Sequence, residues 1–173
     1  MENFTQTEIR ERILKVFNSC RSKKNTPFEE SHFMDFLMFP PCKKNQIRNS
    51  FRGADKHGIF MRKIELEFGI CFTLSDYDST FSLDDFTQKV LERIGKTKSN
   101  KNIIKQRMNE KNYFIFEIVT LLILGTLYYF FGIHWLPILL TPLLLTAVYW
   151  ICSHRIKDIL HNKKLGNIIL KQK

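Results

Sequence analysis

The side chains able to do chemistry are scattered along this 173-residue chain and do not recur at motif spacing. The four cysteines lie too far apart in sequence for a zinc site or a disulfide framework, and no histidine pairs with a cysteine at ligand spacing. The chain also contains no glycine-rich phosphate loop and no Gly-x-Ser-x-Gly elbow. We therefore expect no enzyme, no metal and no cofactor. The residues concerned are Cys20, Cys42, Cys71, Cys152, His32, His57, His134, His154 and His161.

An acidic stretch is the remaining candidate for a cation site. Asp76, Asp78, Asp84 and Asp85 supply carboxylates, but their spacing departs from the EF-hand pattern. The last two follow Ser82 in a sequence typical of a helix N-terminus, where acidic residues stabilise the first turn. A solvated turn followed by a capped helix explains these residues without a ligand.

The first 95 residues have the pattern of a small helical bundle. The sequence TQTE after Phe4 predicts a capped helix start, and apolar residues follow it at helical intervals. Gly69 is placed to end a later helix. Residues 75–80 are expected to form a short helix or turn, while the pattern of residues 21–41 leaves their structure open. The expected helices span residues 5–20, 43–52, 59–68 and 83–94.

The run IELEFGICFTLSDYDSTFSLDDFTQKVLERI, Ile64 to Ile94, resembles the second half of an acyl carrier protein. It has a helix that ends in an acidic-Phe-Gly-Ile sequence, a link to an Asp-rich turn, and a helix introduced by a small polar residue and Leu-x-Asp. The likeness covers residues 50–95, and residues 5–49 only as a first helix and a long loop. The resemblance implies a four-helix bundle of the kind that carries acyl chains on phosphopantetheine, which is attached to a serine at the start of the second helix.

The attachment serine is missing from this chain. A gapless count back from Phe68 places Ala54 at its position, whereas a match of Gly53-Ala54-Asp55 to the family's residues before the serine places Lys56 there. Neither side chain can be esterified to a phosphate. The resemblance therefore implies a non-carrying relative, similar to acyl-carrier-like proteins of enteric bacteria whose attachment site is degenerate.

The charge of the expected second helix also differs from the family. Carrier proteins present an acidic second helix to basic patches on their enzymes. Here Arg62 and Lys63 stand beside Glu65 and Glu67, so the helix would not offer the same electrostatic match. These four residues are the candidates for contact with a protein partner.

The net charge of +10 is concentrated in two short segments. Residues 1–95 hold 15 basic and 14 acidic groups, whereas residues 96–112 and 153–173 each hold six basic groups and one acidic group. We expect four parts: a cytoplasmic helical domain (1–95), a basic linker (96–112), an apolar hairpin (113–152) and a basic amphipathic tail (153–173) that is interrupted at Gly166-Asn167. A DNA-binding domain is disfavoured, because it would carry the basic charge on its own face.

Residues 113–152 form an apolar block with one charged residue, Glu117. Its two arms, Tyr113–Phe131 and Leu136–Cys152, are each near the ~17 to 25 residues that a helix needs to cross a bilayer. A turn separates them, so the block is expected to be a transmembrane helical hairpin. The alternative is a pair of buried core helices, but the 95 residues of preceding domain are too few to cover them.

The flanking charges predict the orientation of the hairpin. The basic residues of both flanks lie outside it and its turn carries none, which under the positive-inside rule places both termini in the cytoplasm. Tyr128, Tyr129 and Trp135 would form the outer aromatic belt. We expect no secretory leader before the domain, since the chain opens with polar and acidic residues. With the resemblance, this implies an integral protein of a bacterial inner membrane, whose basic tail meets anionic lipid.

Four residues of the hairpin are candidates for helix packing or for lining a polar path: Glu117, Gly125, Thr126 and Pro142. Pro142 is expected to kink the second arm. Two functions follow. In the first, the domain is a membrane-anchored, non-carrying protein-interaction module without nucleic-acid partners. In the second, the hairpin is active as a membrane-perturbing or pore-forming homo-oligomer, the domain is its sensor, and the role is in immunity or defence.

Overall fold

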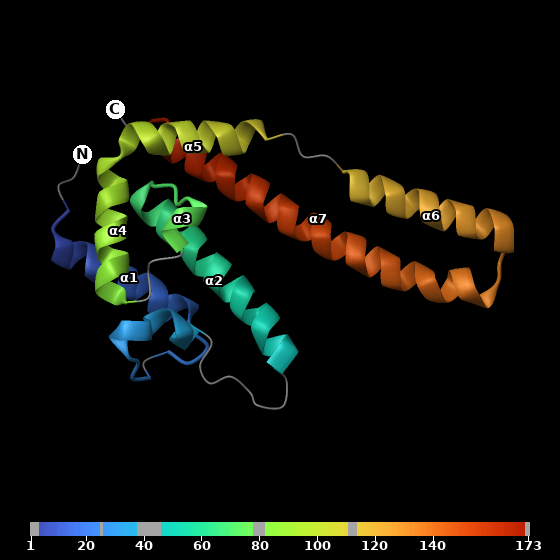
Figure 1. The fold of residues 1–173 in the computed structure, drawn as a ribbon, viewed down its shortest axis with the longest axis horizontal. Coiled ribbons are helices and arrows are strands. Elements are labelled where there is room, and N and C mark those ends of the chain that lie inside the picture. The colour runs from blue at the N-terminus through green and yellow to red at the C-terminus, as the bar shows by residue number, and fades with distance from the viewer. Residues whose placement is uncertain (1–3, 25, 38–45, 78–81, 111–113, 172–173) are drawn as a thin grey trace. The chain divides into compact units, whose positions relative to one another are not determined.

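A computed structural model confirms that the chain is all-helical, with seven α-helices and one 3-10 helix in the part that it describes (Figure 1). That part comprises residues 4–24, 26–37, 46–77, 82–110 and 114–171, with the backbone alone at residues 46–54, 74, 77 and 136. The expectations for Cys42, Asp78 and Tyr113 lie outside it. The chain divides into two compact units, one of residues 1–106 with 164–173 and the other of residues 107–163.

Helix α1 (Gln6–Cys20) begins at the predicted capping box. The Glu8 amide donates to Thr5 Oγ1 at 3.3 Å, and the Thr5 amide donates to the Glu8 carboxylate at 2.8 Å. The two bonds satisfy backbone donors that the first turn of a helix leaves unpaired. Ile9, Ile13 and Phe17 follow at helical intervals and are buried.

Helix α2 (Gln46–Phe68) is one continuous helix of 23 residues. The separate helices predicted at 43–52 and 59–68 are therefore wrong, because the helix runs through Gly53 and Gly58. An interior glycine costs only about 1 kcal/mol, which packing along the rest of a long helix offsets. The helix ends as predicted at Gly69, whose φ is 60°, and the Ile70 amide donates to the Glu65 carbonyl at 3.1 Å.

The core of the first unit is aromatic. The Phe33 ring of η1 (Glu30–Leu37) lies 5.2 Å from Phe17, 6.1 Å from Phe60 and 5.7 Å from Phe86, measured between ring centroids. Phe86 belongs to α4 (Leu83–Gly95), which starts at Ser82 as predicted, with the Asp85 amide donating to Ser82 Oγ at 3.1 Å. The turn expected before it contains the short helix α3 (Leu74–Tyr77). Four fully buried phenylalanines thus join α1, η1, α2 and α4.

Helix α5 (Thr97–Asn109) occupies the segment that the sequence assigned to a basic linker. Asn100 and Ile104 are its buried residues, and they lie on one side of the helix. This helix was hard to predict, because only one of its two buried positions is hydrophobic.

The second unit is a hairpin. Helix α6 (Ile115–Phe131) is followed by a short turn and by α7 (Trp135–Ile169), which continues past the hairpin into the first unit. The helix α7 contains Pro142 and also runs through Gly166 and Asn167, so the predicted interruption of the tail is wrong. A glycine inside a helix lowers stability without ending the helix unless the chain also turns there.

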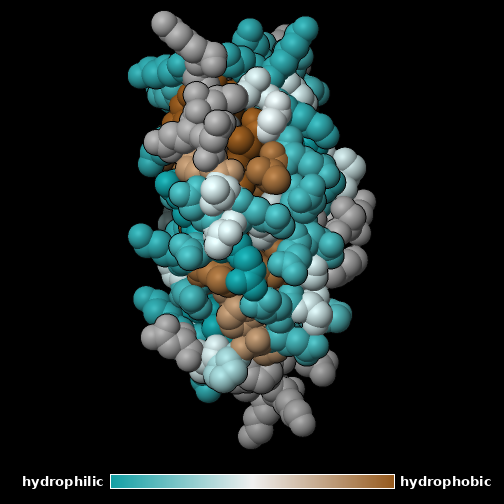
Figure 2. Space-filling model, turned by 90° about the vertical axis from the view of Figure 1, so that its left-hand side faces the viewer, coloured by the Kyte–Doolittle hydropathy of each residue, from teal (hydrophilic) through white to brown (hydrophobic). Residues whose placement is uncertain are grey.

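The two units differ in their surfaces. On the side that carries α1 and α4, hydrophilic residues cover most of the described surface and hydrophobic ones show only in small patches (Figure 2). By contrast, the large hydrophobic side chains that are exposed all lie from Met108 onward in the described chain. The stretch Pro137–Ile169 of α7 is long and apolar enough to cross a membrane, and α6 is a shorter apolar helix.

Candidate functional site

The position expected for the attachment serine lies inside α2. In the family that the sequence resembles, the serine stands at the start of the second helix, whereas α2 begins at Gln46, upstream of both Ala54 and Lys56. The Lys56 ammonium donates to Ser22 Oγ. Neither candidate position offers a hydroxyl, and neither is at a helix N-terminus, where backbone amides would meet a phosphate.

The four charged candidates on α2 do not share one exposed surface. Lys63 is exposed and donates to Ser19 Oγ at 3.0 Å, while Arg62 is half-buried. Glu67 is exposed and pairs with Arg12 at 3.5 Å. Glu65 is 3% exposed, so its assignment to a contact surface is wrong.

Glu65 instead belongs to a polar junction around the extended link 70–73. Its Oε1 accepts from the Phe72 amide at 3.0 Å, and Asn100 Oδ1 accepts from the Cys71 amide at 3.3 Å. Asn100 Nδ2 in turn donates to the Arg93 carbonyl at 2.7 Å. A buried backbone amide without a hydrogen-bond acceptor lowers the stability of the fold. The Glu65 and Asn100 side chains supply these acceptors and so allow the link to be buried.

An ion pair completes this junction. Arg93 Nη2 lies 2.5 Å from Asp76 Oδ2 and also donates to Thr73 Oγ1 at 2.8 Å. Asp76 Oδ2 accepts from the Thr73 amide at 2.6 Å and from its hydroxyl at 2.8 Å. Burial disfavours the charged carboxylate, but the bonds from Thr73 and the Arg93 guanidinium outweigh it, so the pKa of Asp76 is lowered from its ordinary value. Asp76 therefore has a structural role as an ionised carboxylate.

The C-terminal segment packs against the same region. Leu165 and Ile169 are fully buried with Cys71 and Ile104, and Leu66 packs against this cluster. The tail was expected to meet anionic lipid, but two of its hydrophobic residues, Leu165 and Ile169, are buried in the first unit. The end of α7 is thus part of the folded unit that contains the polar junction.

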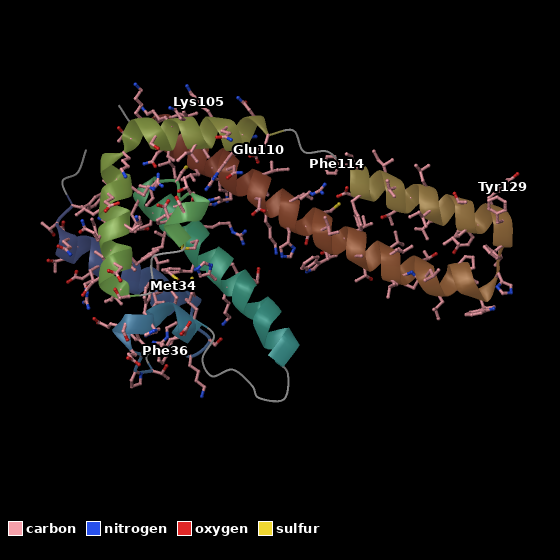
Figure 3. The ribbon with its side chains drawn as sticks, viewed as in Figure 1. Met34, Phe36, Lys105, Glu110, Phe114 and Tyr129 are labelled. Carbon is pink, nitrogen blue, oxygen red and sulfur yellow. The ribbon has the colours of Figure 1, made fainter. Side chains whose placement is uncertain are left out.

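A second charged site lies within the hairpin. Glu117 on α6 is 8% exposed, and its Oε1 accepts from Arg155 Nη1 at 3.1 Å and from Cys152 Sγ at 3.5 Å, both on α7. The Arg155 guanidinium also lies 5.9 Å from the centroid of the Phe114 ring. Figure 3 shows Phe114 at the start of α6 and Tyr129 near its other end, so the ion pair lies at the end of the hairpin away from the turn.

The remaining hairpin candidates are not brought together with Glu117. Gly125 and Thr126 are exposed on α6, and a methyl group at Gly125 would meet nothing within 4 Å. Thr126 Oγ1 donates to the Leu122 carbonyl at 2.8 Å. Pro142 lies inside α7, and its carbonyl accepts from Thr146 Oγ1 at 2.6 Å. These hydroxyl groups are bonded within their own helices, as threonines in apolar helices commonly are.

The sequence missed the residues that bind the junction together. Asp76, Arg93 and Asn100 come from three different helices and belong to no motif. The one available signal was Arg93 on the mainly apolar inner side of α4, where a buried cation needs an acidic partner.

Comparison with known proteins gives no family. No protein-family model, no curated protein and no solved structure matches the chain. The resemblance to acyl carrier proteins therefore stays a prediction that rests on the residues of Ile64–Ile94.

Proposed function

We propose that this chain is an integral membrane protein that crosses the membrane twice and holds a non-carrying, acyl-carrier-like helical domain at the cytoplasmic face, where the domain binds a protein partner. The observation that carries the proposal is the segregation of exposed hydrophobic side chains. Among the described residues, all the large ones that are exposed lie from Met108 onward, while the large hydrophobic side chains of the bundle are mostly buried. A soluble monomer rarely exposes such a continuous apolar surface.

The lengths of the helices support two spans. Helix α6 has 17 residues, which at ~1.5 Å per residue gives about 25 Å. The hydrocarbon core is ~30 Å thick, and a bilayer accommodates a helix a few ångströms short by local thinning. The apolar part of α7 is longer, so it can cross with some tilt.

The ion pair in the hairpin supports the same placement. A lone carboxylate in a membrane is costly, and intramembrane charges are usually paired. The Glu117 carboxylate accepts hydrogen bonds from Arg155 and Cys152 of the opposite helix, at the end of the hairpin that carries the basic flanks. The positive-inside rule then places both termini in the cytoplasm, and the resemblance makes the bacterial inner membrane the expected site.

The missing hydroxyl supports a binding role for the domain. Neither Ala54 nor Lys56 can accept phosphopantetheine, and the exposed side chains of α2 include Lys63 and Glu67. A carrier-like bundle that carries no acyl group can still bind a protein partner through its surface side chains. We place the partner contact on this exposed part of α2.

The alternative is a hairpin that perturbs the membrane as a homo-oligomer. Gly125 leaves open space on α6, which would permit close helix contact. The hydroxyl groups of Thr126 and Thr146 are bonded within their own helices, however, and so do not form a polar path across one hairpin. We rank this function second.

The purified full chain, reconstituted in lipid vesicles, tests the proposal. Its two tryptophans, Trp135 and Trp150, are 66% and 55% exposed and flank the apolar part of α7. Lipids with brominated acyl chains should quench their fluorescence, whereas a hairpin outside the bilayer would leave it unchanged. Incubation with coenzyme A and a phosphopantetheinyl transferase should add no mass, since a gain in mass would show that the domain is a carrier.

Two further measurements separate the candidate functions. A photoreactive amino acid in place of Lys63 should cross-link the full chain to a defined protein in the membrane, while the same amino acid at exposed Gln88 on α4 should not. Expression of the chain should leave the membrane potential of cells unchanged if the hairpin is an anchor. Collapse of the potential would favour the pore-forming alternative.

A further inference from the structure

One side of α5 carries a row of basic residues. Lys98, Lys101 and Lys105 recur at intervals of three and four residues, so they share one side of the helix, while Asn100 and Ile104 are buried on another. Lys98 and Lys105 are exposed, and Figure 3 shows Lys105 projecting outward from α5. The helix from Thr97 to Asn109 contains no acidic residue.

The C-terminal end of α7 adds to this charge within the same compact unit. Lys164 and Lys171 are exposed, and residues 164–171 contain no acidic group. Burial of Leu165 and Ile169 fixes this segment to the unit through the cluster that also contains Ile104 of α5. Two neighbouring elements of one folded unit therefore both carry excess positive charge.

Chain connectivity keeps both elements close to the hairpin, whatever the orientation of the two units. Helix α5 ends at Asn109 and α6 begins at Ile115, and the six residue steps between them reach at most ~22 Å. Lys164 follows Cys152 along one continuous helix by about 18 Å. These distances are upper limits and exceed two Debye lengths at physiological salt, beyond which charges are largely screened. The tether therefore permits contact with a charged bilayer surface, and the basic groups gain attraction from it only where they lie close to that surface.

We propose that the exposed basic side of α5, together with the C-terminal end of α7, binds anionic phospholipid headgroups of the membrane that holds the hairpin. The proposal rests on the membrane insertion proposed above. Lys98 and Lys105 are about 10 Å apart along the helix and do not converge on one point. A row of this kind fits a surface of many headgroups, whereas a single phosphate would need convergent donors. Headgroup contact at α5 would hold the domain against the bilayer in one orientation.

The test uses the full chain in lipid nanodiscs of phosphatidylcholine, with or without phosphatidylglycerol. A fluorescent amino acid replaces exposed Asn102 on α5, and a small part of the lipid carries a quencher on its headgroup. Quenching at position 102 should be stronger when phosphatidylglycerol is present and should weaken as salt is added. The double variant Lys98→Glu, Lys105→Glu should lose this difference. The matched control is the double variant Lys23→Glu, Lys24→Glu, which makes the same change in net charge at exposed residues far from α5 in sequence. This control should keep the stronger quenching in the presence of phosphatidylglycerol.

Tryptophan quenching by brominated acyl chains, measured on the same samples, reports insertion of the hairpin. If Trp135 and Trp150 are quenched but position 102 does not respond to phosphatidylglycerol, or if the double variant behaves like the control, the headgroup proposal is wrong and the membrane anchor stands. If neither tryptophan is quenched, both proposals fail.

Discussion

Arg155 Nη1 lies 3.1 Å from one carboxylate oxygen of Glu117 and 3.3 Å from the other, so a single guanidinium joins the start of α6 to α7. These residues are 38 positions apart in sequence. Because Glu117 is buried and Arg155 is partly exposed, the pair fixes the alignment of the two helices at the end of the hairpin away from the turn. The pair is thus a link between α6 and α7 across the hairpin.

The first prediction concerns this pair. Glu117→Gln and Arg155→Gln should each destabilise the hairpin, and the double variant should cost less than their sum, with a coupling energy of about 1 to 2 kcal/mol. A double-mutant cycle from unfolding in mild detergent measures it. Exposed Lys157→Gln is the control, with an expected change within about 0.5 kcal/mol. Strict additivity of the two single variants would mean that the pair contributes nothing.

The second prediction concerns the buried carboxylate of Asp76. The pKa of Asp76 is lower in the folded chain than in the unfolded chain, where it is about 3.9. The ionised carboxylate therefore contributes fully to the free energy of unfolding above about pH 3.9, and this contribution is lost as the pH falls through the lowered folded pKa. Asp76→Asn should cost about 2 to 3 kcal/mol at neutral pH, because Arg93 loses its charged partner. It should also lose less stability on acidification than the native chain does.

Urea unfolding at neutral pH and at about pH 3 checks both statements, since the second lies below the ordinary pKa of an aspartate. Exposed Asp55→Asn is the matched substitution and should stay within about 0.5 kcal/mol of the native chain at neutral pH. Equal acid sensitivity of the native chain and Asp76→Asn would contradict the role of the ion pair.

The third prediction concerns the end of α7. Leu165 is fully buried and Leu170 is 43% exposed, so one substitution can be compared at two nearby positions. Leu165→Ala should cost about 2 to 4 kcal/mol through loss of packing against Cys71 and Ile104. It should also raise the rate at which a maleimide modifies the Cys71 thiol. Leu170→Ala should change neither quantity. Identical behaviour of the two variants would show that the end of α7 does not pack against the domain in solution.

The elements predicted correctly from the sequence are those with local signals. The capping residues Thr5 and Ser82 and the terminal Gly69 act on backbone groups a few residues away, so the sequence alone marks these helix ends. Helix α2 was divided in the prediction because glycines locally favour a break. Its later part packs into the core through Phe60, Ile64 and Phe68, and such tertiary contacts are contained in no short window of sequence.

The polar junction could not be predicted from the sequence for a related reason. Asn100 has lysines as sequence neighbours on α5, so nothing nearby in the sequence marks it as buried. Its role is to accept a hydrogen bond from the Cys71 amide, 29 residues away. Glu65 looked like a surface charge because it stands beside Lys63 and Glu67. Only the position of the 70–73 link shows that its carboxylate faces inward. Contacts of this kind depend on the tertiary arrangement and leave no period in the sequence.

The fourth prediction compares two glycines of the hairpin. Gly132 has φ 57° and ψ −149°, a conformation that is essentially restricted to glycine, so Gly132→Ala should cost about 1 to 3 kcal/mol by straining the turn. Gly125 is in α6 with open space around its Cα, so Gly125→Ala should leave the monomer unchanged or stabilise it by up to about 1 kcal/mol. Unfolding in detergent measures both. A destabilising Gly125→Ala that also changes the oligomeric state would indicate helix contact between copies at this glycine.

The central claim, two spans with both termini in the cytoplasm, is tested most directly by reporter fusions in bacterial cells. A phosphatase that is active only outside the cytoplasm is fused after Ile133 in the turn, or after Lys173 at the end of the chain. The account predicts activity for the fusion after Ile133 and none for the fusion after Lys173. Activity after Lys173 would place the C-terminus outside the cytoplasm and contradict the claim, and inactivity of both fusions would mean that the hairpin does not cross the membrane.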